Sequence, residues 1–147
     1  MDLADLELRN RTYGRFVELG RAPTAAEVAA EAGLTVEAVE AGWRRLHDAH
    51  ALVLDLSTGE LLMANPFAAR PTPFRVEADG RWWYANCAWD AFGIGAALGV
   101  DSRIETACPD CHEPIALTVT DGRPDDDSPV FHVLVPADAW WRDIGFT

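Results

Sequence analysis

The sequence of 147 residues contains no lysine, since all twelve of its basic residues are arginine. Schiff-base chemistry, which needs a lysine amine, is therefore excluded. Positive charge is also scarce overall, because 24 acidic residues bring the formal net charge to −12. We therefore expect neither nucleic acid nor an anionic membrane as a partner.

Long apolar runs and targeting signals are missing as well. No stretch approaches the roughly 20 apolar residues of a membrane span. The acidic N-terminus, residues 1–7, lacks the basic and apolar regions of a signal peptide. Apolar residues make up 49% and charged residues 24%, which is typical of a globular protein. We expect one domain or two small ones, located in the cytoplasm, with the three cysteines reduced.

The first part of the chain predicts three helices followed by a β-ribbon. An imperfect apolar stripe runs over residues 3–19, and a short helix over residues 23–33 has Thr24 as its N-cap and Glu27 as its capping-box partner. A third helix begins after Thr35. Two apolar stretches, 51–55 and 60–64, flank the turn signal Ser57-Thr-Gly and predict a hairpin. Residues 1–64 are thus expected to form a winged-helix-like module.

A winged helix suggests DNA binding, but the charges of this one argue against it. Residues 1–70 carry seven arginines against eleven acidic residues, a balance of −4. The helix in the place of a recognition helix carries Arg44 and Arg45 but also Glu37, Glu40 and Asp48. Since a DNA-binding face must neutralise phosphates, we predict a packing module that does not recognise DNA.

A proline-rich segment, residues 65–73, is the predicted linker, because its prolines continue neither a helix nor a central strand. Residues 74–147 then predict a small mixed or antiparallel sheet with one helix, so the fold class is α+β. Paired strands are expected over 101–106 and 115–120, an exposed acidic loop over 121–129 and a further strand over 130–136. His132 on that last strand is expected to be structural.

The residues that carry chemistry begin with Cys87 and Asp90. A strand precedes them, and Ala91 to Leu98 is small and apolar enough for a buried helix. Cys87 is therefore expected near a helix start, where free N–H groups and the helix dipole favour a thiolate. Residues three apart share a helix face, so Asp90 would place its carboxyl beside the sulfur. A buried cysteine next to a helix-capping aspartate would show the same spacing.

The other two cysteines lie in Cys108-Pro-Asp-Cys-His-Glu-Pro. With His112 they match the haem-attachment pattern, which belongs to exported proteins. A zinc site is an alternative, although the second Cys-x-x-Cys that makes such sites specific is missing. A redox pair would need a strand-to-helix setting, whereas Pro109 and Pro114 favour a tight turn. A turn with two partly buried thiols, Cys108 and Cys111, and a soft-metal site on that turn both stay open.

Residues 71–147 resemble the organomercurial (alkylmercury) lyases, and the helical N-terminal half fits their architecture. The resemblance depends on Thr72-Pro before a strand, Asp79-Gly-Arg, the Cys108 turn leading into Pro114-Ile-Ala-Leu-Thr-Val, Val133-Leu-Val-Pro and, most specifically, Tyr84-Ala-x-Cys-Ala-x-Asp. It implies that Cys87 binds mercury as a thiolate. It also implies that Asp90 helps to deliver the proton that replaces mercury on carbon.

The resemblance predicts a carbon–mercury lyase acting on small organometallic substrates and releasing a hydrocarbon and Hg(II). No cofactor is expected, and external thiols or a mercuric-ion acceptor protein would remove the Hg(II). Zinc at Cys108 and Cys111 remains an alternative. Thiolate is the ligand that soft Hg(II) prefers. A thiolate nearby and an apolar pocket are expected to raise the pKa of Asp90 toward a useful range.

The chain departs from the family at one point. The lyases use a second active-site cysteine near the C-terminus, after the last long strand, and residues 140–147 contain none. Either that cysteine lies beyond Thr147 or this is a variant with one active-site thiol. Two other functions stay open: a non-catalytic soft-metal (Hg, Zn or Cu) binding protein on the same scaffold, or an enzyme that cleaves another carbon–metal or carbon–heteroatom bond.

Overall fold

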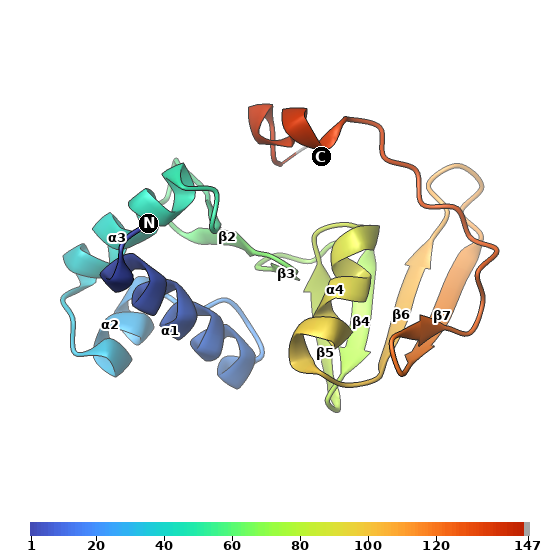
Figure 1. Ribbon diagram of the computed structural model, residues 1–147, viewed down its shortest axis with the longest axis horizontal. Coiled ribbons are helices and arrows are strands. Elements are labelled where there is room, and N and C mark those ends of the chain that lie inside the picture. Colours follow the sequence, from blue (N-terminus) through green and yellow to red (C-terminus); the bar gives the residue numbers. More distant parts are fainter. Residues whose placement is uncertain (146–147) are drawn as a thin grey trace. The chain divides into compact units, whose positions relative to one another are not determined.

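The computed structural model describes residues 1–145, and the chain forms two compact units, Met1–Ala64 and Asn65–Thr147. Helices and antiparallel strands are both present, which confirms the α+β class (Figure 1). None of the helices described is long and apolar enough to span a membrane.

The first unit contains three helices and a two-stranded ribbon. Their bounds are α1 (Leu3–Leu19), α2 (Ala25–Ala32), α3 (Val36–Asp48), β1 (Val53–Leu54) and β2 (Leu61–Ala64). Both predicted helix caps are present, since Thr24 and Glu27 form a capping box and the side chain of Thr35 accepts from the N–H of Ala38 at 3.2 Å. The predicted hairpin is confirmed by the antiparallel pairing of β1 with β2.

The core of this unit lies between α1 and α3. Val39, Trp43 and Leu46 lie one helical turn apart on α3 and are almost completely buried. The indole N–H of Trp43 donates to the hydroxyl of Thr12 at 2.9 Å, and that hydroxyl donates to the carbonyl of Leu8 at 2.9 Å. Each buried polar atom in this chain of contacts therefore has a partner, which burial requires.

The second unit is an antiparallel sheet with one long helix. Its elements are β3 (Phe67–Ala68), β4 (Phe74–Ala78), β5 (Arg81–Ala85), α4 (Ala88–Leu98), β6 (Ser102–Ala107), β7 (Pro114–Thr120), β8 (Arg123–Pro124) and the 3₁₀ helix η1 (Ala137–Arg142). The strands lie in the order β3-β5-β4-β6-β7-β8. The predicted pairing of 101–106 with 115–120 is confirmed, with Ile104 opposite Leu117.

Helix α4 packs on one face of this sheet, against β4, β5 and β6 (Figure 1). The strands turn alternate side chains toward it, among them Val76, Trp83 and Ile104, and α4 contributes Ala91, Ile94 and Gly95. A Cβ atom on Gly95 would lie 2.6 Å from the hydroxyl oxygen of Ser102. Glycine is therefore needed where α4 approaches the sheet most closely, and this close approach fixes the position of the helix.

The strand expected over 130–136 was wrong, because this segment is irregular. Val130 is 89% and Leu134 77% exposed, so the apolar alternation does not turn one set of side chains into the core. The segment joins no strand of the sheet, and on the outer side of β7 the short β8 pairs only with Val119 and Thr120. His132 accordingly lies on exposed, irregular chain. Of the region 140–147, Phe146 and Thr147 lie outside the described residues.

Candidate active site

Cys87 is the N-cap of α4, as the sequence predicts. Strand β5 ends at Ala85, and the backbone of Cys87 is extended, with φ −151° and ψ −178°, before the helix begins at Ala88. The side chain is half-buried, forms no disulfide and makes no capping hydrogen bond. Its sulfur is thus held at the end of a sheet strand, close to the first N–H groups of a helix.

The expectation that the helix start favours the thiolate is wrong for the unliganded protein. Burial raises the pKa of Cys87 above its ordinary value of 9.0, and the negative charge of Asp90 raises it further. The backbone N–H groups of Asp90 and Trp89 act in the opposite direction but do not prevail. Desolvation disfavours the charged form more than the two N–H groups stabilise it, so the free thiol holds its proton more strongly than an exposed cysteine does.

Asp90 lies in the first turn of α4 and is half-buried. Burial raises the pKa of its carboxyl above the ordinary 3.8, and a hydrogen bond from Asn86 opposes this effect. The direction agrees with the prediction from sequence, and burial is the main cause. A carboxyl with a raised pKa retains its proton closer to neutral pH, as a proton donor must.

Asn86 is the residue that sequence reasoning missed. Its side-chain N–H donates to Oδ2 of Asp90 at 3.0 Å, and the same amide nitrogen lies 3.1 Å from Oδ1 of Asn65 and 3.4 Å from the carbonyl oxygen of Pro66. The amide therefore ties the Asp90 carboxyl to the segment that precedes β3. The available signal was weak: an amide four residues before an aspartate, next to the cysteine.

The three tryptophans near Cys87 do not share one environment. Trp83 belongs to the core, where its indole donates to the carbonyl of Ala78 at 3.2 Å and its ring lies 5.1 Å from that of Phe67. Trp82 is on the opposite face of the strand, with the Arg75 guanidinium 4.3 Å from its ring centroid. Trp89, beside Asp90 in the sequence, is 68% exposed.

Cys108 and Cys111 lie in the turn between β6 and β7, as predicted. The N–H of Cys108 donates to the carbonyl of Glu113 at 2.9 Å, and the N–H of His112 donates to the carbonyl of Cys108 at 2.9 Å. Backbone N–H groups of Cys111 and Asp110 and the Cys111 thiol all donate to the Cys108 sulfur, and these hydrogen bonds lower the pKa of Cys108. Both thiols are free. Within residues 1–145, no group of three or more His, Cys, Asp or Glu side chains is placed to hold a metal ion.

The family model of the alkylmercury lyases matches residues 67–147, more than half of the chain. The chain belongs to the alkylmercury lyase family. The matched part contains β3 to β8 and α4, and with them Cys87, Asp90 and the Cys108 turn. The resemblance drawn from the sequence is confirmed at the level of the family.

A solved structure, the mercury-bound form of MerB2, has a similar fold, with a TM-score of 0.64 and 22% sequence identity. The similarity covers 82% of this chain and 59% of the MerB2 chain, so this chain spans about three-fifths of that relative's length. At such an identity the likeness establishes the fold alone. Comparison with curated proteins finds no match.

Proposed function

We propose that the chain is an alkylmercury lyase that cleaves the carbon–mercury bond of small organomercurials with Cys87 and Asp90. The observation that carries the proposal is that one helix start, in a chain of this family, holds a half-buried thiol and a carboxyl whose pKa burial raises. Thiolate is the natural ligand of a soft metal, and a neutral carboxyl is a suitable proton donor.

The first step is ligand exchange at the Cys87 sulfur. The Cys87 sulfur forms a bond to the mercury of the organomercurial as the bond from mercury to an external thiolate breaks, and the Cys87 proton passes to that departing thiolate. No unliganded thiolate has to form at this half-buried site, because the proton departs as the metal–sulfur bond forms. Coordination by sulfur then weakens the bond between mercury and carbon.

The second step is protonolysis. Asp90 donates its proton to the carbon atom, the electron pair of the carbon–mercury bond stays with carbon, and Hg(II) remains on the Cys87 sulfur. Since Oδ2 of Asp90 accepts a hydrogen bond from Asn86, the transferable proton belongs on Oδ1. External thiols then remove the Hg(II). No cofactor takes part in this sequence.

Release of benzene from phenylmercury in the presence of excess thiol tests the activity directly. The Asp90→Asn variant separates a proton donor from a helix cap, because asparagine preserves size and capping but has no acidic proton. Losing the donor should slow single-turnover cleavage by about 10² or more while phenylmercury still binds. Cleavage by this variant at the wild-type rate would remove Asp90 from the mechanism. If the wild-type chain binds phenylmercury and releases no benzene, it is a soft-metal binding protein instead.

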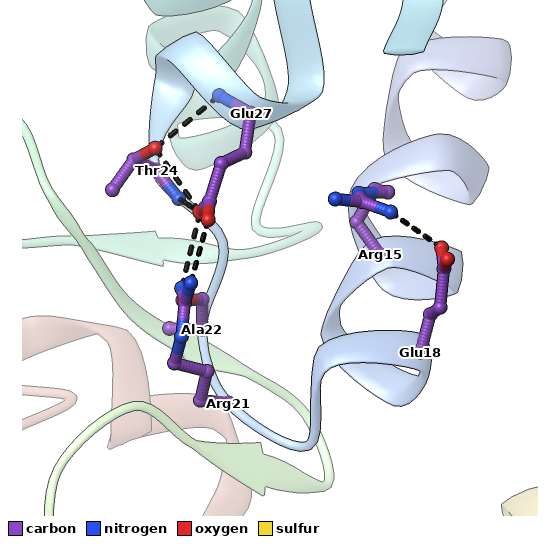
Figure 2. A network of polar contacts seen from close by, with 6 residues as sticks. All are labelled: Arg15, Glu18, Arg21, Ala22, Thr24 and Glu27. Carbon is purple, nitrogen blue, oxygen red and sulfur yellow. Dashed lines mark hydrogen bonds and ion pairs between the residues drawn. The ribbon is translucent and has the colours of Figure 1, made fainter. Parts of the chain in front are cut away.

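We further propose that the first unit, a winged-helix-like module, serves packing and not DNA recognition. Most of its arginines contact carboxylates: Arg45 contacts Asp5 at 2.6 Å and Arg11 contacts Glu7 at 2.8 Å. The guanidinium of Arg9 instead lies over the ring of Tyr13. Figure 2 shows Arg15 with Glu18 and Arg21 with Glu27, which also caps α2 through Thr24. Arginines neutralised in this way are poor phosphate ligands. Sequence-selective, salt-sensitive binding of a DNA library at low micromolar protein would contradict the proposal.

A further inference from the structure

The turn between β6 and β7 places two free thiols next to each other. The two cysteines are three residues apart, and the Cys111 thiol donates a hydrogen bond to the Cys108 sulfur. Two hydrogen bonds close the backbone around them, and His112 has a left-handed conformation, with φ 61°. The fold of the turn therefore sets the backbone positions of the two cysteines, and no long loop has to be ordered before both can bind one ion.

The environment of the turn suits a bound metal ion. Cys108 is half-buried and Cys111 exposed, so an ion can reach both sulfurs from solvent. Backbone N–H groups of Asp110 and Cys111 point at the Cys108 sulfur and stabilise negative charge on it. Because Cys111 is exposed, its side chain can rotate to place the second sulfur across an ion.

The number of donors selects the kind of ion. Structural Zn(II) requires four ligands, and the described residues 1–145 bring no third His, Cys, Asp or Glu side chain into a metal-binding group with this pair. Two thiolates instead match soft ions that are stable with two ligands, such as Hg(II) and Cu(I). The pair is thus suited to a linear S–metal–S arrangement.

The register of the sheet relates this turn to Cys87. On the central strand β4, Arg75 is opposite Tyr84 of β5 and also opposite Glu105 of β6. Strands β5 and β6 therefore run in the same direction and end on the same side of the sheet. Their ends are two strand spacings, or about 10 Å, apart. Cys87 follows the end of β5 and Cys108 follows the end of β6, so both thiol sites lie at this end of the strands.

We propose that Cys108 and Cys111 form a second soft-metal site, which chelates Hg(II) between two thiolates. This site lies on the same side of the sheet as Cys87, where β5 and β6 end. In exchange with a bis-thiol complex of Hg(II), two mercury–sulfur bonds to the external thiols break and two bonds to Cys108 and Cys111 form. The two cysteine protons pass to the departing thiolates, and mercury stays Hg(II). Binding of a two-coordinate soft ion follows from the turn alone, whereas Hg(II) as the natural ion rests on the proposed function.

Competition with a monothiol tests the chelate. The full-length Cys87→Ser variant, reduced and freed of reductant, is titrated with HgCl₂ in the presence of glutathione at about 1 mM, which is within the range of effective concentrations of closely linked groups. We expect this variant to hold one Hg(II) tightly. Its two remaining thiols, Cys108 and Cys111, should then no longer react with a disulfide reagent. The variants Cys87→Ser/Cys108→Ser and Cys87→Ser/Cys111→Ser should give up their mercury to glutathione.

The matched control is Cys87→Ser/His112→Gly, because glycine accepts the left-handed backbone of residue 112 and removes the imidazole. It should hold Hg(II) as tightly as Cys87→Ser. The site does not exist as proposed if Cys87→Ser retains mercury no better than its single-thiol derivatives. Retention of Zn(II) against a chelator would show that further ligands take part and would overturn the two-coordinate geometry. Binding of inorganic Hg(II) involves no cleavage of a carbon–mercury bond, so a failure of the lyase activity does not affect this result.

Discussion

Cys87 and Cys108 each follow the end of a strand, on the same side of one sheet. Their surroundings nevertheless shift their pKa values in opposite directions. The thiol of Cys87 is partly buried beneath the start of α4, and burial raises its pKa. Hydrogen bonds from the backbone and from Cys111 lower the pKa of Cys108, which lies in an open turn. Both sulfurs have backbone N–H groups and an aspartate nearby, so the difference comes mainly from the stronger desolvation of Cys87 and from the additional hydrogen bond that Cys111 donates to Cys108.

The comparison suggests different roles for the two sites: a reaction at Cys87 and metal binding at the Cys108 turn. A thiol and a carboxyl whose pKa values are both raised hold their protons more strongly than usual, which suits a reaction that consumes a proton at a bound metal. A pair of thiols, one of them with a lowered pKa, is suited to holding an ion reversibly.

Replacing Cys87 should have the largest effect. The Cys87→Ser variant loses the only proposed ligand that activates the carbon–mercury bond, so benzene release from phenylmercury should fall by about 10³ or more. Single-turnover kinetics at saturating phenylmercury measure this, with circular dichroism to confirm that the variant folds. If Cys87→Ser retains activity and a Cys108→Ser/Cys111→Ser variant loses the first turnover, the two sites have been assigned the wrong way round.

The reactivity of the two thiols toward iodoacetamide should differ at neutral pH. Since only the thiolate reacts, the lowered pKa of Cys108 predicts faster alkylation there than at Cys87 at pH 7. As the pH rises past the ordinary thiol value of 9.0, the thiolate fraction of Cys87 grows and the difference in rate should shrink. Peptide mapping by mass spectrometry over a series of pH values gives both rates. Equal rates at pH 7 would abolish the contrast.

Asn86→Ala should alter the Asp90 side of the site and leave the Cys108 turn unchanged. Without the Asn86 hydrogen bond, the pKa of Asp90 rises further, so the alkaline loss of cleavage activity should move to higher pH. At pH values below this alkaline loss, the cleavage rate should fall by about tenfold, because the Asp90 carboxyl is no longer oriented. Asn65→Ala is the control, since it removes one partner of Asn86 and no contact of Asp90. A pH profile identical to wild type would mean that Asn86 does not position the donor.

Gly95→Ala should have the smallest effect, on stability rather than chemistry. The added Cβ would meet the Ser102 side chain and the carbonyl oxygen of Val100, and such overpacking costs about 1–3 kcal/mol, partly offset by better helix propensity. Urea denaturation measures the loss. Alkylation of Cys87, which α4 covers, should accelerate, while that of Cys108 should not.

Gly14→Ala is the matched control for this substitution. Gly14 lies inside α1, and its added Cβ would meet nothing within 4 Å. Higher helix propensity should then stabilise the chain by up to about 1 kcal/mol. If Gly95→Ala stabilises the chain to the same degree, α4 is not held against the sheet as closely as described.

Local sequence signals determined most of the secondary structure. The capping box of Thr24 and Glu27, the turn signal Ser57-Thr-Gly and the helix start at Cys87 each depend on residues a few positions apart, so each can be recognised without tertiary contacts. The motif around Cys87, together with the supporting motifs of residues 71–147, also indicated the family that the family model then confirmed. The strand expected over 130–136 was wrong, because apolar alternation in the sequence does not itself supply the partner strand that a β-strand pairs with.

Tertiary structure alone decided the chemistry of the side chains. The sequence places Cys87 at a helix start, which favours a thiolate, but the packing of α4 on the sheet buries the sulfur and reverses the direction of its pKa. The role of Asn86 depends on Asn65 and Pro66, which are about twenty residues away in the chain. Strand register brings the Cys87 and Cys108 sites to the same side of the sheet, where β5 and β6 end. Burial and long-range contacts set these properties, because desolvation depends on what surrounds a group and not on its neighbours in sequence.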